Sequence, residues 1–89
     1  MRSFASAKFW RAYQKLTAEE QEQAEKAHQL FQSDPQHPSL HFKPTWRDRG
    51  VWSARASRNL RALGKRDGDE IEWFWIGRHK NYDPILGSG

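Results

Sequence analysis

Three side chains that can take part in proton transfer follow the most apolar segment of the chain. His79, Tyr82 and Asp83 lie within five residues of one another, just after Trp73–Ile76. A histidine titrates near neutral pH and can exchange protons with a ribose 2′-hydroxyl or a leaving 5′-oxygen. Tyr82 could do the same if nearby cations lowered its pKa, or it could stack on a base. We assign His79 and Tyr82 to a site and Asp83 to capping the turn before Pro84; the structural alternative packs Tyr82 under a sheet.

Positive charge is concentrated in one third of the chain. The 89 residues carry a net charge of +4, and residues 41–66 hold eight Lys or Arg side chains against one acidic residue, Asp48. Residues 1–40 are neutral, and residues 67–89 are acidic. This distribution favours a polyanion or an acidic protein as the partner, with a merely solvated basic face as the alternative.

Strand periodicity brings three cations of this basic third together. If neighbouring strands place their polar faces on the same side, Lys43, Arg55 and Arg61 form a cationic ridge across a sheet. Such a ridge can hold a phosphodiester and stabilise the extra negative charge of a pentavalent transition state. The alternative is that each arginine forms an ion pair with Glu70 or Glu72 across a hairpin.

Several classes of chemistry are excluded by what the sequence lacks. The chain has no cysteine, which excludes disulfides and cysteine-based metal or redox sites, and it has no Gly-rich phosphate loop or G-x-S-x-G motif. His37 and His41 are spaced as H-x₃-H, but Pro38 lies between them and no third ligand is evident, so we expect no metal site and no cofactor. No apolar run approaches the roughly 20 residues of a membrane helix, and the N-terminus lacks a signal peptide's apolar stretch. We therefore expect a soluble cytoplasmic protein.

The elements that would position these side chains begin with two helices. Apolar spacing predicts a helix over 8–16, with Ser6 as its cap. A second helix begins after Thr17, which fits a capping box with Glu20, and ends before Pro35. The side chains that this second helix would bury are Ala24, Ala27, His28 and Phe31, the histidine being a core residue.

After these helices the apolar pattern changes to the alternation of β-strands. The strands that this pattern predicts are Leu40–Lys43, Val51–Ser57, Leu60–Arg66 and Glu70–Gly77. Asp67-Gly68 is typical of a type I′ turn, in which both central residues have positive φ, so 60–76 should form a hairpin. Strict alternation places Ile71, Trp73 and Trp75 on one face of the last strand and Phe74 and Ile76 on the other. We assign Trp10, Trp73 and Trp75 to the core and allow Trp46 and Trp52 near a ligand.

These elements together predict an α+β fold. Two N-terminal helices would pack on one face of a three- to four-stranded antiparallel sheet, with a further short strand at Arg2–Phe4 as an option. We expect a single domain over residues 1–86, followed by a flexible tail over residues 87–89. The second face of the sheet would carry the site.

From about Phe4 to Leu86 the chain resembles toxins of the RelE/ParE superfamily of toxin-antitoxin systems. The segments that carry the resemblance are Leu40–Lys43, Val51–Arg55, Leu60–Gly64, Asp69–Gly77 and the terminal His79-x-x-Tyr82-Asp83. The resemblance implies a fold of the microbial ribonuclease type. In the RelE branch it also implies cofactor-free cleavage of messenger RNA in the ribosomal A site, with the 2′-hydroxyl as nucleophile and a 2′,3′-cyclic or 3′-phosphate as product.

The same resemblance implies roles for five residues. Lys43 matches the basic residue of the first sheet strand that acts on the phosphate or as a base, and Arg55 and Arg61 match the strand arginines that grip the scissile phosphate. His79 and Tyr82 match the C-terminal acid/base and stacking positions, and the group that transfers the proton stays open among Lys43, His79 and Tyr82. The further cations that we expect to bind RNA are Arg47, Arg49, Arg58, Lys65, Arg78 and Lys80.

We therefore expect a metal-independent, ribosome-dependent endoribonuclease toxin that stops translation and growth. Its partners would be the ribosome, messenger RNA and a cognate acidic antitoxin that masks the basic face, and the free toxin would be monomeric. Two alternatives come from other classes: a non-nuclease toxin of the ParE type that inhibits DNA gyrase, and a non-catalytic RNA-binding module. The presence of all five matching residues favours the nuclease.

Overall fold

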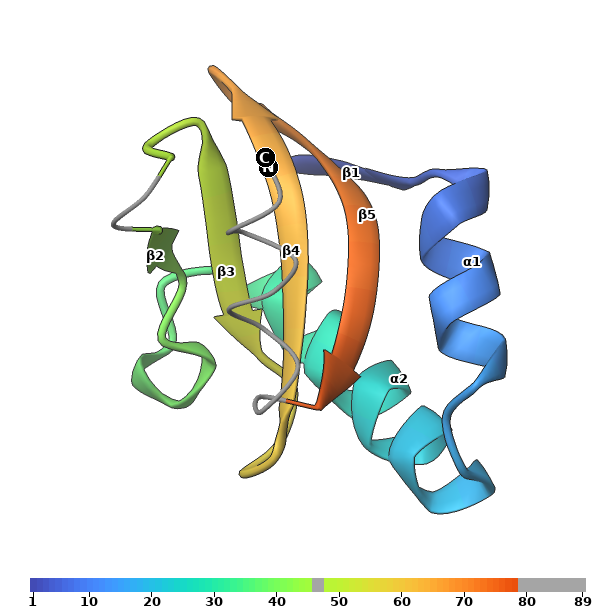
Figure 1. Ribbon diagram of the computed structural model, residues 1–89. Helices are drawn as coiled ribbons and strands as arrows, with labels where there is room; N and C mark the ends of the chain where they lie inside the picture. Colours follow the sequence, from blue (N-terminus) through green and yellow to red (C-terminus); the bar gives the residue numbers. More distant parts are fainter. Residues whose placement is uncertain (46–47, 79–89) are drawn as a thin grey trace.

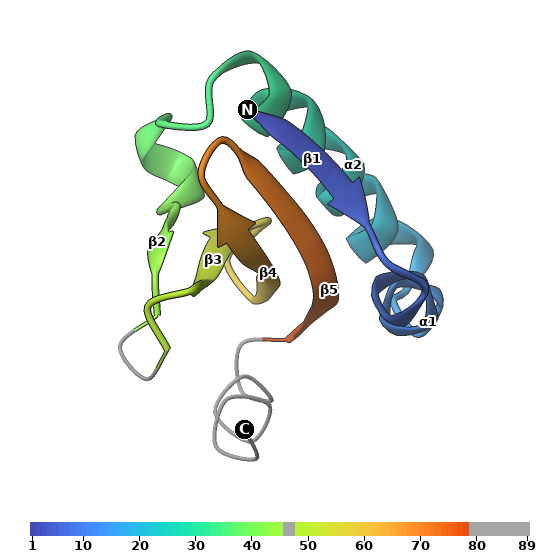
Figure 2. The same ribbon diagram turned by 90° about the horizontal axis from the view of Figure 1, so that it is seen from above.

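The computed structural model describes residues 1–45 and 48–78, which form two helices against a five-stranded sheet (Figure 1). The strands are β1 (Arg2–Ala5), β2 (Lys43–Pro44), β3 (Val51–Arg55), β4 (Leu60–Asp67) and β5 (Glu70–Arg78). The helices are α1 (Ala7–Gln14), α2 (Ala18–Ser33) and the short 3₁₀ helix η1 (Pro38–Leu40). The α+β class and the two N-terminal helices are confirmed. Seen from above, both main helices lie on the same side of β5 as β1 (Figure 2).

The sheet has the order β1-β5-β4-β3-β2 and is mixed rather than wholly antiparallel. The strands from β2 to β5 form an antiparallel meander, whereas β1 pairs in parallel with the first half of β5. The further short strand considered at Arg2–Phe4 is therefore present as β1. It brings the sheet to five strands, one more than the three or four expected. The expected domain over residues 1–86 extends beyond the described residues, and so does the expected tail over residues 87–89.

Both main helices begin where their capping residues predict. The Ser6 hydroxyl accepts a hydrogen bond from the Phe9 amide at 3.3 Å, and α1 starts at the next residue. Thr17 and Glu20 exchange hydrogen bonds in a capping box, with distances of 2.9 and 3.1 Å between their backbone and side-chain atoms. Each bond satisfies an amide that the helix itself leaves unpaired, which fixes the start of α2. Within the described ranges, no helix is long and apolar enough to cross a membrane.

The strand expected over Leu40–Lys43 is mostly absent. Leu40 closes the 3₁₀ helix η1, and His41 follows it in the left-handed region with φ of 44°. A local hydrogen bond explains the difference, because the His37 Nδ1 atom accepts from the Ser39 amide at 3.2 Å and Pro38 favours the first helical position. Extended pairing with β3 therefore begins at Lys43.

A β-bulge changes which side chains of β5 face the helices. Leu63 pairs with Trp75 and Gly64 pairs with Trp73, so Phe74 has no partner on β4. The expected grouping of Trp75 with Ile71 and Trp73 is therefore wrong, because the extra residue shifts the alternation beyond Trp73. The buried core against the helices contains Ala24, Phe31, Leu40, Ala54, Ala62, Ile71, Trp73 and Ile76. We call this side of the sheet the helix face and the opposite side the outer face.

The turn between β4 and β5 also differs from its prediction. Asp67 pairs with Glu70, so the two loop residues are Gly68 and Asp69. Gly68 has φ of 60°, and His41 is the one non-glycine residue in the described ranges with positive φ. Positive φ at the first loop position alone is the pattern of a type II′ turn rather than type I′.

Three assignments to the core are wrong. Trp75 is half-buried on the outer face and does not belong to the buried core. The Trp10 side chain is 48% exposed, because its position on α1 lies beside the apolar stripe that contacts β5. His28 is exposed on α2. Of the two tryptophans allowed near a ligand, Trp52 is half-buried, packs against Phe42 with ring centroids 4.7 Å apart, and is covered by the Arg66 guanidinium at 4.3 Å. Trp46 lies outside the described residues.

Candidate functional site

The strand register places the three cations of the predicted ridge on one face. Lys43 lies opposite Ser53, and Arg55 lies opposite Arg61. Directly opposed residues of antiparallel strands point to the same side, and so do residues two apart on one strand. Because Ala54 and Ala62 lie in the core on the helix face, the register assigns the ridge to the outer face. Arg55, the last residue of β3, also borders the cavities on the α2 side of the sheet.

Arg55 and Arg61 form a like-charged pair at the end of the β3–β4 hairpin. Their Cβ atoms lie within about 5.5 Å of each other in this register, and like charges directly opposite one another destabilise a sheet. The alternative of ion pairs with the hairpin acids is wrong for both arginines. Arg61 lies opposite Gly77, roughly 13 Å along the strand from the position opposite Glu72, and the Glu70 carboxylate binds Arg2 at 3.2 Å.

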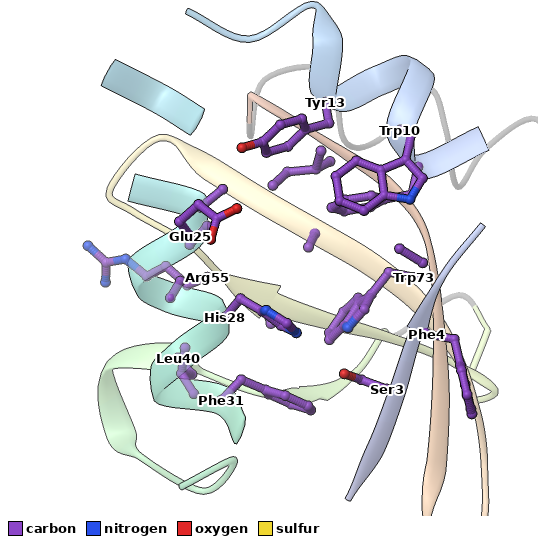
Figure 3. A pocket seen from close by; sticks show the side chains of 18 residues that line it. Ser3, Phe4, Trp10, Tyr13, Glu25, His28, Phe31, Leu40, Arg55 and Trp73 are labelled. Atoms are coloured by element: carbon purple, nitrogen blue, oxygen red, sulfur yellow. The ribbon is translucent and has the colours of Figure 1, made fainter. Parts of the chain in front are cut away.

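The three ridge cations differ in how they are held. The Arg61 Nη1 atom donates to the Ser57 and Leu60 carbonyls at 3.1 Å each and to the Arg58 carbonyl at 3.4 Å, which fixes this side chain on the hairpin turn. Arg55 is half-buried, Lys43 is exposed, and neither forms a hydrogen bond or ion pair within the described part of the chain. The Arg55 guanidinium points away from the cavity on the helix face (Figure 3).

The further cations expected to bind RNA are distributed over several places. Lys65 is exposed on the outer face opposite Val51, and Arg49 and Arg58 are exposed in the turns before and after β3. Arg78 lies on the helix side instead, where its Nε atom donates to the Glu20 carboxylate at 3.2 Å. The predicted site residues that lie outside the described ranges are Arg47, His79, Lys80 and Tyr82. The expected turn cap, Asp83, lies outside them as well.

The arrangement on the outer face suits an anion. Lys43 and Arg55, which have no partner among the described residues, and the anchored Arg61 can contact the non-bridging oxygens of a phosphate and stabilise charge that develops there. Among the described residues, no group of three His, Asp or Glu side chains is placed to hold a metal ion. This face therefore offers cations that can stabilise negative charge.

The helix face contains a second, mostly apolar site that the sequence did not reveal. A cavity of about 260 Å³ lies between α1, α2, β1 and the sheet, and aromatic rings from Trp10, Tyr13, Phe31 and Trp73 surround it (Figure 3). Burial raises the pKa of the Tyr13 phenol, and the nearby charge of Glu25 raises it further. Ala24 and Ala27 on the inner side of α2 could have indicated this cavity in the sequence, because alanines opposite large aromatic rings leave space unfilled.

Solved toxin structures have a similar fold. A chain of the RelB–RelE antitoxin–toxin complex from Methanococcus jannaschii matches with a TM-score of 0.73 at 12% identity, covering 92% of this chain and 96% of that one. YafQ from Escherichia coli strain BL21(DE3) matches with a TM-score of 0.70 at 11% identity, covering 92% and 98%. The YoeB/ParE toxin from Agrobacterium tumefaciens matches with a TM-score of 0.65 at 19% identity, covering 89% and 99%. No curated protein sequence matches the chain.

The fold is thus that of a small toxin of the RelE type. A family model described as the ParE-like toxin domain matches residues 18–84, which is more than half of the chain. The protein therefore belongs to the ParE-like toxin domain family, within the RelE/ParE superfamily of toxins of toxin-antitoxin systems.

Proposed function

We propose that this toxin is a metal-independent, ribosome-dependent endoribonuclease that cleaves messenger RNA in the cytoplasm. The observation that carries the proposal is the opposed pair of Arg55 and Arg61, with Lys43 on the same face. Arg61 also holds the hairpin turn through the Ser57 and Leu60 carbonyls. A phosphodiester bound at this face would contact both guanidinium groups and offset the repulsion between them.

In the proposed reaction the ribose 2′-hydroxyl attacks the adjacent phosphorus. The hydroxyl loses its proton to a base, the bond from phosphorus to the 5′-oxygen breaks, and an acid donates a proton to the leaving oxygen. This leaves a 2′,3′-cyclic phosphate and a free 5′-hydroxyl. Lys43, Arg55 and Arg61 bind the phosphate and stabilise the charge of the pentavalent transition state, while His79 and Tyr82 are candidates for proton transfer and stacking.

The test compares two double variants during expression in a bacterial host, with transcript 5′ ends mapped. The wild type should arrest growth and cleave transcripts in frame with codons. Lys43→Ala/Arg55→Ala should lose both effects, because each good donor contributes about 10²–10³ in rate. Arg61→Ala is less informative, since its guanidinium also holds the hairpin turn.

Arg2→Ala/Lys26→Ala is the matched control. It also removes two positive charges, from exposed side chains that lie outside the ridge, each paired with a glutamate. The control should remain toxic. Growth arrest without in-frame cleavage, or full toxicity of Lys43→Ala/Arg55→Ala, would refute the nuclease.

A gyrase inhibitor of the ParE type is the second candidate, and the description of the matching family favours it. A supercoiling assay with purified gyrase distinguishes the two functions. The nuclease should leave supercoiling unchanged at concentrations that cleave ribosome-bound messenger RNA. Inhibition of supercoiling without RNA cleavage would reverse the assignment.

We further propose that a cognate acidic antitoxin binds the toxin and masks the outer face. The similar structures include the RelB–RelE complex and the DinJ–YafQ complex from Escherichia coli, which supports a partner of this kind. The cationic outer face offers charge complementarity to an acidic chain. Coexpression with the antitoxin should restore growth, and the complex should weaken as ionic strength rises.

A further inference from the structure

A groove of about 560 Å³ lies between α1 and the second half of β5. Figure 1 shows α1 alongside this strand. β1 pairs with β5 only from Glu70 to Trp73, so among the described residues no strand covers the same edge from Phe74 onward. The groove is lined by Phe74, Trp75 and Gly77 on β5 and by Lys8, Arg11 and Lys15 at α1.

The α1 side of the groove is cationic. Lys8, Arg11 and Lys15 are spaced i, i+3 and i+7, which places them on one side of a helix with 3.6 residues per turn. α1 itself contains no acidic residue. Glu20 lines the groove as well, but its carboxylate binds Arg78 and the Thr17 amide. Residues 1–40 have no net charge, but their charges are separated in space. α1 is basic, whereas α2 carries four glutamates.

Trp75 gives the groove a flat aromatic surface next to the ridge. The β-bulge turns this half-buried side chain to the outer face, opposite Leu63. A Cβ atom added at Gly77 would lie 2.5 Å from the indole Cζ2 atom, so the ring lies against the glycine backbone. Gly77 is in turn the cross-strand partner of Arg61, and neighbouring strands are about 4.8 Å apart. The aromatic surface thus continues the cationic ridge toward α1.

We propose that the α1–β5 groove is a second RNA-binding subsite that holds single-stranded nucleotides adjoining those on the ridge. A base stacks on the Trp75 indole, and neighbouring phosphates contact Lys8, Arg11 and Lys15. The inference rests on the proposed function, because it extends the same bound RNA strand beyond the scissile phosphate. Cations beside a stacking ring are the usual combination in proteins that bind single strands without reading their sequence. An acidic peptide would use the cations but would gain little from the ring.

The experiment measures binding of a short, unstructured, fluorescently labelled RNA oligonucleotide to the full chain across a series of salt concentrations. Lys8→Gln/Arg11→Gln should weaken binding and reduce the slope of log affinity against log salt by about 1.4, since each phosphate contact on a single strand contributes about 0.7. Arg2→Gln/Lys26→Gln removes the same charge outside the groove and should keep the wild-type slope.

Stacking is tested separately at constant charge. Trp75→Leu should bind the oligonucleotide roughly 5- to 150-fold more weakly, and Trp75→Phe should recover part of the loss. If Trp75→Leu does not fold, the charge variants still decide the question, because their substitutions are on the surface of α1.

The subsite is refuted if Lys8→Gln/Arg11→Gln and Trp75→Leu bind RNA as the wild type does. It is also refuted if the charge variant loses affinity for polyglutamate but not for RNA. This result leaves the nuclease intact, because in-frame cleavage by the wild type and its loss in Lys43→Ala/Arg55→Ala are measured independently. Conversely, groove-dependent RNA binding without any cleavage supports the subsite and refutes the nuclease.

Discussion

Gly64 lies at the β-bulge, directly beneath two core side chains. A Cβ atom at this position would be 2.7 Å from Ile71 Cγ1 and 2.8 Å from Trp73 Cε3, closer than carbon atoms can approach. The absence of a side chain lets Ile71 and Trp73 pack across β4 toward the helices. This residue therefore helps to place the bulge that turns Trp75 outward.

Replacing Gly64 should destabilise the fold. Gly64→Ala forces two buried side chains to move, and overpacking of this kind costs about 1–3 kcal/mol of the free energy of unfolding. Chemical denaturation measures the loss. Gly50→Ala is the matched control, because this exposed glycine has no positive φ and a Cβ atom there would meet only the Asp48 carboxylate, at 3.3 Å. Equal stability of Gly64→Ala and the wild type would contradict the close packing.

At the scale of the element, the N-terminus of α2 joins the helix layer to the end of β5. The Glu20 carboxylate accepts hydrogen bonds from the Thr17 amide and from the Arg78 guanidinium. These contacts, with the Thr17 bond as the largest cause, hold the pKa of Glu20 below its ordinary value of 4.5 despite partial desolvation. One side chain therefore both caps a helix and fixes the last described residue of the sheet.

The lowered pKa of Glu20 predicts how stability depends on pH. Because the pKa is lower in the folded than in the unfolded state, ionised Glu20 stabilises the fold at pH above about 4.5. This contribution is lost as the pH falls from there through the lower folded-state pKa. Glu20→Gln should therefore melt below the wild type at neutral pH, and the difference should shrink in acid.

Melting temperatures of three proteins across a pH series provide the measurement. Glu19→Gln removes the same charge from the same helical turn without disturbing the Thr17 and Arg78 contacts, and should stay close to the wild type. A difference between Glu20→Gln and the wild type that stays constant down to acid pH would refute the assignment.

On the scale of the whole molecule, the helix layer and the sheet have different surfaces. α2 is rich in glutamate, while α1 and the outer face are basic. α2 contacts the sheet through Ala24 and Phe31, and the cavity of about 260 Å³ remains between them. Atoms that line this cavity lack packing partners on one side. A larger apolar side chain placed there should therefore increase the stability of the fold.

Filling this cavity should stabilise the protein. Ala27 is half-buried and lines the cavity, so Ala27→Leu adds apolar contact there. Cavity-filling substitutions contribute about 0.5–2 kcal/mol, and in a domain of this size 1 kcal/mol raises Tm by about 4–8 °C. Calorimetry measures the change, with Gln29→Leu on the exposed side of α2 as the control. A lower Tm for Ala27→Leu would show that the space cannot accept the side chain.

Much of the fold could be predicted from local sequence patterns. The caps at Ser6 and Thr17, the two helices and the strands β3 to β5 depend on interactions between residues close in the chain, which spacing reveals directly. The common face of Lys43, Arg55 and Arg61 also followed from alternation, because no irregularity interrupts β3 or the first half of β4. Their roles in binding and catalysis stay predictions.

Tertiary structure decided the rest, because each remaining feature depends on a partner distant in the chain. The bulge that turns Trp75 outward follows from packing of Ile71 and Trp73 over Gly64, and the parallel pairing of β1 follows from the free edge of β5. Arg78 looked like one more cation for RNA until Glu20, 58 residues away in sequence, was placed beside it. The sequence by itself determined the class of fold and the charge of each segment. Only the tertiary structure decided which of those charges share a surface, since that depends on register and not on composition.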